Sequence, residues 1–200
     1  MDRTRATRLL GTAAVAALGI GHKLEVFNYF VCAGMGAATA TLVAQNLGAG
    51  APDRAARAAW RALFLTVLPV AGVTVLLVAF PEAAVRVFNS DAGVVAAGST
   101  YALLVGLSQV FMAAEVVLLG AFAGAHWTAV PATLVVAVTA ARVPIAAALV
   151  AAGWGVEAVW LAISLTTVVK GSILAVAFVV RHGTGSSAGV QCPVHTGGMR

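Results

Sequence analysis

Five apolar runs, each long enough to cross a lipid bilayer as a helix, constrain the fold of this chain more than any other feature of its sequence. A transmembrane helix needs about 20 predominantly apolar residues, and the runs cover residues 27–47, 55–80, 94–122, 131–152 and 156–180. A sixth run, residues 9–21, reaches only about 20 Å at about 1.5 Å per residue, short of the roughly 30 Å hydrocarbon core. We therefore predict an all-α integral membrane protein, a helical bundle of five full transmembrane helices plus one short N-terminal helix.

The composition excludes the soluble alternatives. Hydrophobic residues make up 61% of the 200 residues and charged residues only 10%, with a mean hydropathy of +0.98. Soluble domains carry about 45–50% apolar and about 25% charged residues, and a globule of this size cannot hide so many apolar side chains from water. An ordinary cytosolic enzyme and a disordered chain are both excluded. The two cysteines, Cys32 and Cys192, make no disulfide framework.

The basic residues indicate topology rather than nucleic-acid binding. The net charge is +5, but the basic residues lie between the apolar runs and form no single polar face. The loop after the first long run holds Arg54, Arg57 and Arg61, and the last run ends at Arg181. If the four intervening spans alternate in direction, these arginines share one side, and the positive-inside rule makes that side and the C-terminus cytoplasmic.

The N-terminal arginines leave one question of topology open. Arg3, Arg5 and Arg8 precede the short sixth run, and they too favour the cytoplasm. They reach it only if residues 9–21 span the membrane, and that run is too short.

Turn-forming residues divide the chain into three parts. Glycines end the first long run, and a proline followed by Asp53 restarts a helix. Pro81 opens a short amphipathic stretch, and a Gly-Trp-Gly link joins the last two runs. We expect a short N-terminal helix in residues 1–26, a transmembrane bundle in residues 27–182 and a disordered cytoplasmic tail, rich in Gly, Ser and Thr, in residues 183–200.

A charged side chain within a span is costly and is by default a functional hypothesis. Glu115 lies near the middle of the third run, where a carboxylate would serve a carrier of protons or cations. The alternative is a structural role, in which the Glu115 side chain bonds to a neighbouring helix and only holds the bundle together.

Four more polar side chains lie within the runs. Arg142, two residues before Pro144, would face the interior of a bent helix or pair with Glu115, and Lys170 would be a second charge partner or extend to the interface. Ser108 and Gln109 would line a polar pathway or hydrogen-bond between helices. In addition, glycines at positions 120 and 124 form a small-xxx-small pattern that allows close helix approach.

Metal and catalytic motifs are weak by comparison. His22 and Glu25 have metal-ligand spacing, but a His-Glu-x-x-His site lacks its second histidine here. Cys192 and His195 in the tail are an equally weak signal. An intramembrane hydrolase that uses His22 and Glu25 is thus a minor alternative, and we predict neither an enzyme nor a bound metal.

Several blocks, in order, resemble the multidrug and toxic compound extrusion (MATE) transporters. Residues 34–55 contain a Gln-Asn-Leu-Gly-Ala-Gly helix end followed by a basic restart with Arg-Ala. Residues 80–91, 109–124, 142–144 and 155–162 resemble later blocks of the family. The resemblance covers roughly residues 15–182 and indicates the C-terminal lobe, with residues 27–47 as helix eight and residues 156–180 as helix twelve.

The resemblance implies a function. MATE transporters have two pseudo-symmetric six-helix lobes and export organic cations and drugs in exchange for protons or sodium. The expectation is a segment of such an antiporter in the plasma membrane, with Glu115, Gln109 and Ser108 as the cation- or substrate-binding residues and no cofactor beyond the coupling ion. Some members carry an acidic ligand where this chain has Met112, so Glu115, one turn later, would replace it.

The resemblance also implies the partners of the chain. They are the lipid bilayer, small organic cations and either a separate N-terminal lobe or a second copy of the chain, and not nucleic acid. The alternative function is a non-transporting remnant or membrane-packing subunit that lacks the N-terminal lobe.

Overall fold

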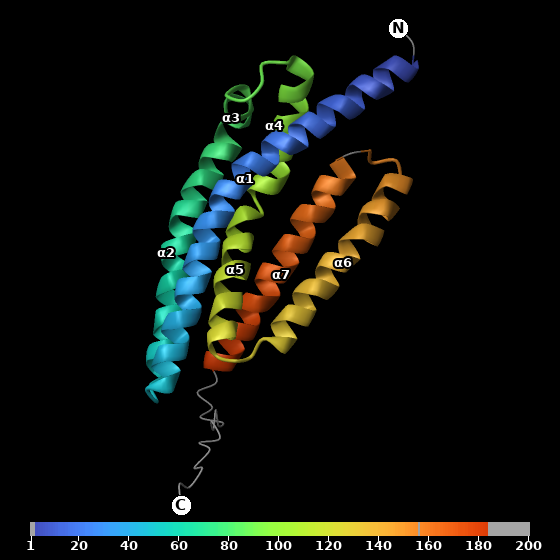
Figure 1. Cartoon of the computed structure of the whole chain (residues 1–200). Helices are drawn as coiled ribbons and strands as arrows, with labels where there is room; N and C mark the ends of the chain where they lie inside the picture. Colours follow the sequence, from blue (N-terminus) through green and yellow to red (C-terminus); the bar gives the residue numbers. More distant parts are fainter. Residues whose placement is uncertain (1–2, 156, 184–200) are drawn as a thin grey trace, which may run out of the picture.

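The computed structural model describes residues 3–155 and 157–183, with the side chains of residues 15–155 and 157–181. In this part of the chain all regular secondary structure is α-helical (Figure 1). The helices are α1 (Arg3–Gly48), α2 (Pro52–Ala79), α3 (Pro81–Arg86), α4 (Ala92–Gly106), α5 (Gln109–Gly124), α6 (Ala129–Ala151) and α7 (Glu157–Gly183). The predicted tail, apart from Gly183 at the end of α7, lies outside the described residues.

Helices α1, α2 and α5 pack against one another and form the centre of the bundle. Helix α7 packs on the other side of α5, and α6 packs mainly on α7 at the edge of the bundle (Figure 1). Helix α4 contacts both α1 and α7, and the short α3 covers α4. A region bounded by α1, α4, α5, α6 and α7 therefore lies on the side of the bundle away from α2.

The helix ends follow the predicted stop and start signals. Gly50 adopts a φ of 69°, and its N–H donates to the Leu47 carbonyl, which ends the first long helix. Pro52 then opens α2, where its missing N–H removes no helical bond. Asp91 caps α4, because its carboxylate accepts hydrogen bonds from the backbone N–H groups of Gly93 and Val94.

The prediction of a separate short N-terminal helix is wrong. Residues 9–21 and 27–47 belong to one continuous helix, α1, which spans 46 residues. The polar segment between the two runs, which begins at His22, contains no proline and no glycine. Polarity alone does not stop a helix, since its backbone hydrogen bonds are independent of side-chain hydropathy. The segment that separated two runs in the sequence therefore lies within α1.

The third apolar run, predicted as one span, is divided into α4 and α5, whose axes differ by 46°. At the break, the Ser108 N–H and the Ser108 hydroxyl both donate to the Val105 carbonyl, at 3.0 and 2.8 Å. Such local bonds compete with the regular helical pattern. The break places Ser108 and Gln109 at the start of α5, where both are buried.

Glycines allow α1 and α5 to approach closely, as the small-xxx-small pattern predicts. A Cβ atom at Gly120 would overlap the backbone of Gly36, and one at Gly124 would overlap the backbone of Ala40. On the opposite side of α5, Gly171 of α7 lies against the backbone of Phe111 in the same way. Close approach on both sides positions α5 tightly between α1 and α7.

The prediction of a multi-pass helical bundle is confirmed. Among the described residues, α1 from Val15 onward, α2, α6 and α7 are each long and apolar enough to cross a membrane, and α4 and α5 give a fifth span if the bent pair is counted as one. The molecule is an all-α, multi-pass membrane bundle.

Candidate functional site

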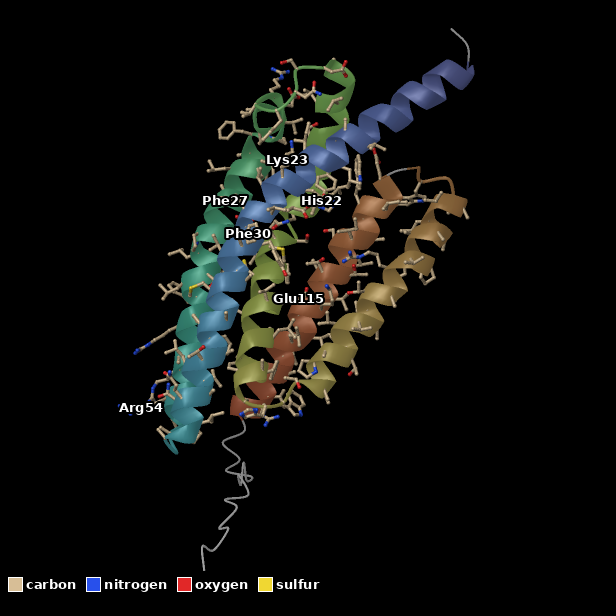
Figure 2. The ribbon with its side chains drawn as sticks, viewed as in Figure 1. His22, Lys23, Phe27, Phe30, Arg54 and Glu115 are labelled. Atoms are coloured by element: carbon tan, nitrogen blue, oxygen red, sulfur yellow. The ribbon has the colours of Figure 1, made fainter. Side chains whose placement is uncertain are left out.

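A cavity of about 240 Å³ opens between five helices on the side of the bundle away from α2. Its polar lining comes from side chains of all five helices. These are His22, Glu25 and Tyr29 of α1, Tyr101 of α4, Ser108, Gln109 and Glu115 at the start and middle of α5, Arg142 of α6, and Thr167 and Lys170 of α7. Figure 2 labels His22 and Glu115, which lie at different levels of this region. Ionisable groups thus converge on one cavity within an otherwise apolar bundle.

All the site residues selected from the sequence line this cavity. These residues are Ser108, Gln109, Glu115, Arg142 and Lys170. The sequence placed them on three separate apolar runs, and only the packing of α5, α6 and α7 brings them to one place. Their roles in binding stay predictions.

Glu115 and Lys170 form a buried ion pair between α5 and α7. The Lys170 ammonium donates to the Glu115 carboxylate at 2.8 Å, and each side chain is 9% exposed. The pair adds no net charge to the cavity. Of the partners considered for Glu115, the structure shows Lys170 and not Arg142 in contact with it.

Gln109 and Ser108 differ in how far their side chains are hydrogen-bonded. The Ser108 hydroxyl donates to the Val105 carbonyl. The side-chain oxygen of Gln109 is buried and has no hydrogen-bond partner among the described residues. A buried acceptor without a partner is unfavourable, so Gln109 has the stronger geometry for binding a ligand.

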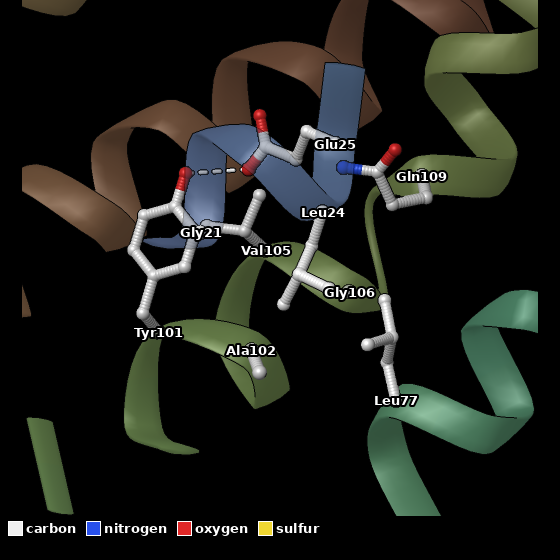
Figure 3. A pocket seen from close by; sticks show the side chains of 9 residues that line it. All are labelled: Gly21, Leu24, Glu25, Leu77, Tyr101, Ala102, Val105, Gly106 and Gln109. Atoms are coloured by element: carbon white, nitrogen blue, oxygen red, sulfur yellow. Dashed lines mark hydrogen bonds between the residues drawn. The ribbon is translucent and has the colours of Figure 1, made fainter. Parts of the chain in front are cut away.

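Glu25 and Tyr101 form a second polar contact that sequence reasoning missed. The Tyr101 hydroxyl donates a hydrogen bond to the Glu25 carboxylate (Figure 3). A smaller cavity of about 10 Å³ lies against this pair and Gln109. Gly21 allows the contact, because a Cβ atom there would overlap the Tyr101 ring. One feature of the sequence could have indicated this contact. Residues 22–26 contain no proline and no glycine, so α1 continues through them and Glu25 lies within a span.

Arg142 completes the set of charges. Its Nε donates to the Thr166 hydroxyl at 3.0 Å, and that hydroxyl donates to the Ala162 carbonyl at 2.7 Å. The cavity lining therefore contains two acidic side chains, Glu25 and Glu115, and two basic ones, Arg142 and Lys170, besides His22.

The weak metal motifs gain no further ligands from the fold. Within the searched, described part of the chain, no group of three or more His, Cys, Asp or Glu side chains comes together. Cys192 and His195 lie outside the described residues.

Comparisons with known proteins agree with the resemblance in the sequence. The sequence model of the MatE family matches residues 3–148. The chain is 32% identical over 115 residues, 58% of its length, to the probable multidrug resistance protein NorM of Pasteurella multocida (strain Pm70). It is 27% identical over 123 residues, 62% of its length, to the protein of the same name from Thermotoga maritima. These matches cover 25% and 26% of the two relatives.

The fold comparison gives the same result. The crystal structure of the eukaryotic MATE transporter AtDTX14 matches with a TM-score of 0.75 at 24% sequence identity, over 84% of this chain and 38% of that one. The chain thus spans about a quarter of the length of the curated relatives it matches. Because the family model matches well over half of its residues, the chain belongs to the MatE family of membrane transporters.

Proposed function

We propose that this chain forms one lobe of an efflux transporter that exports organic cations or drugs in exchange for protons or sodium. The observation that carries the proposal is the cavity, where Glu25, Glu115, Arg142 and Lys170 converge inside an apolar bundle. Ionisable side chains at such depth are expensive, and in transporters they mark substrate and ion pathways. Membership in a transporter family supports the same reading.

The two carboxylates suit different parts of an exchange cycle. Glu25 accepts a hydrogen bond from the Tyr101 hydroxyl and has no ion-pair partner among the described residues, so its carboxyl group is open to a cationic ligand. Glu115 is neutralised by Lys170, so a coupling ion must displace the Lys170 ammonium to bind there. Gln109, with its free side-chain oxygen, and Ser108 would add neutral ligands between them. Competition of substrate and coupling ion for these groups would produce antiport.

The second wall of the cavity would come from another lobe. In transporters built from repeats, substrate binds near the midplane between two halves that move against each other. The described helices line one side of such a site, and a separate N-terminal lobe or a second copy of the chain would provide the other. The plasma membrane is the proposed location, with the C-terminus and the arginine-rich start of α2 in the cytoplasm.

Transport by the purified chain tests this proposal. We would reconstitute the full chain in proteoliposomes, alone and together with the N-terminal lobe of a MatE-family relative, and follow ethidium, a fluorescent organic cation, after imposing a proton or a sodium gradient. Transport driven by one gradient, and lost in Glu25→Gln, would support the exchange mechanism. Glu25 was chosen because its replacement leaves the Glu115–Lys170 pair intact.

A membrane-packing subunit without transport is the competing function. The ion pair of Glu115 with Lys170 favours it, because a paired carboxylate can serve to hold α5 against α7. It predicts no gradient-driven movement of ethidium in either preparation, and no difference between the wild type and Glu25→Gln.

A further inference from the structure

We propose that Arg142 determines which molecules this cavity accepts, because its guanidinium binds the carboxylate of a transported molecule that carries both a carboxylate and an ammonium group. The inference rests on the proposed transport function and adds a specificity-determining residue to it. It starts from the hydrogen bonds that Arg142 does and does not make.

The guanidinium of Arg142 keeps most of its donors free. Arginine carries five N–H donors, and here the Nε donates to the Thr166 hydroxyl. No described carboxylate lies within ion-pair distance of Arg142, since the ion pairs of the described residues are those of Arg86 with Glu82 and Lys170 with Glu115. The terminal nitrogens are therefore available to a ligand.

Thr166 fixes the orientation of this group. The Thr166 side chain is buried, and its hydroxyl donates to the Ala162 carbonyl one turn earlier in α7. Its oxygen accepts from the Nε of Arg142 at 3.0 Å. A guanidinium held through its Nε presents its remaining donors as a planar fork, the geometry that binds a carboxylate through two parallel hydrogen bonds.

The neighbouring charges favour an anionic partner for Arg142. The Glu115 carboxylate is already paired with the Lys170 ammonium, and the Glu25 carboxylate accepts a hydrogen bond from the Tyr101 hydroxyl. An arginine without an anionic contact inside a membrane bundle is costly, and a carboxylate from the substrate removes that cost. Glu25 lines the same cavity and lies within electrostatic reach of Arg142, so it would receive the ammonium end of the same molecule.

The size of the cavity suits the charged end of such a molecule. Its volume is about 240 Å³, whereas pockets for whole drug-sized ligands measure roughly 300–1,000 Å³. The carboxylate and ammonium groups would lie between Arg142 and Glu25, and an apolar remainder would extend out of the cavity.

A pair of matched probes tests the inference. We would measure binding of phenylalanine betaine, a zwitterion, and of its methyl ester, a cation, to the full chain in lipid nanodiscs by calorimetry. We expect the wild type to bind the betaine about tenfold or more tightly than the ester, because the ester loses a charge-assisted, two-point contact. Arg142→Gln should remove this preference by weakening the betaine alone. Arg142→Lys, which keeps the charge but not the fork, should give an intermediate preference.

Further variants separate binding from folding. Thr166→Val keeps Arg142 but removes its hydroxyl partner, and we expect a few-fold weaker binding of the betaine with unchanged binding of the ester. Glu25→Gln should weaken both probes equally. Thermal unfolding of each variant, followed by circular dichroism, identifies a general loss of structure.

Some results would overturn the assignment. These are equal affinity of the wild type for the two probes, no binding of either probe, or an equal loss of affinity for both probes in a folded Arg142→Gln variant.

Efflux is a separate measurement. If the ester is exported equally well by wild type and Arg142→Gln and the betaine has no advantage, the carboxylate site fails while transport stands. If the betaine preference holds without gradient-driven export, transport fails while the site stands.

Discussion

At the scale of single residues, the buried ion pair between Glu115 and Lys170 shows that the carboxylate within the third apolar run already has a partner. The sequence allows two roles for this carboxylate, as a group open to a proton or cation or as a structural contact with a neighbouring helix. The structure shows it at 2.8 Å from a lysine on another helix. Removing one member of a buried pair leaves an uncompensated charge, whereas replacing both leaves none.

The first prediction concerns this pair. We expect Glu115→Gln and Lys170→Met each to lower the free energy of unfolding by about 3–5 kcal/mol. The double variant Glu115→Gln with Lys170→Met should recover most of that loss, because it leaves no uncompensated charge. Thermal unfolding in detergent, followed by circular dichroism, measures all three. Additive losses in the double variant would contradict a coupled pair.

The second prediction concerns the contact between Tyr101 and Glu25. Tyr101→Phe removes the hydroxyl that donates to the Glu25 carboxylate. Because hydrogen bonds to charged groups contribute about 1.5–3 kcal/mol, the variant should be less stable by about that amount. Tyr29→Phe is the matched control, since Tyr29 is 50% exposed. The Tyr29→Phe variant should unfold at the same temperature as the wild type. Equal stability of the two variants would show that the contact contributes nothing.

At the scale of helices, local signals predict the ends well and the interiors less well. Gly50, Pro52 and Asp91 end, start and cap helices as their chemistry predicts. The short polar segment from His22 to Glu25 lies inside α1 and not at a helix boundary, because a fall in hydropathy does not by itself end a helix. The break near Ser108 was missed for the opposite reason, since an apolar sequence hid a change of direction of 46°.

The third prediction tests the contact between α1 and α5. Gly120→Ala places a methyl group into the backbone of Gly36, and we expect a loss of about 1–3 kcal/mol. Gly34→Ala is the control on the opposing helix, because no other atom lies within 4 Å of its added Cβ. It should be neutral or more stable by about 0.5–1 kcal/mol, through better helix propensity. A Gly120→Ala variant as stable as the control would show that α1 and α5 can separate at no cost.

At the scale of the whole molecule, the continuous α1 alters the question of topology. Its two ends lie at opposite ends of the bundle, and the start of α2 lies near the end of α7 (Figure 1). The arginine-rich start of α2 and Arg181 therefore share one end, as counting the spans predicted. The loop between α3 and α4 lies at the other end.

The fourth prediction assigns these ends to the two sides of the membrane. In a variant without Cys32 and Cys192, we would place single cysteines at Asp53 or at Ser90, which are both exposed. With a membrane-impermeant maleimide, Ser90→Cys should react in intact cells. Asp53→Cys should react only after the membrane is permeabilised, since the positive-inside rule makes its side cytoplasmic. The reverse pattern would invert the proposed orientation.

The sequence by itself determined that this chain crosses a membrane several times and which family it resembles. The first conclusion rests on the length of the apolar runs, and the second on short motif blocks, above all the Gln-Asn-Leu-Gly-Ala-Gly helix end within residues 34–55. It also selected Glu115, Gln109, Ser108, Arg142 and Lys170, because polar groups are conspicuous in apolar runs.

Only the tertiary structure decided which of these groups meet. The pairing of Glu115 with Lys170 depends on the face that α5 presents to α7, and the contact of Glu25 with Tyr101 depends on the continuity of α1 and on the space left by Gly21. Helix rotation and close approach arise from packing between segments far apart in the chain, and hydropathy does not encode them.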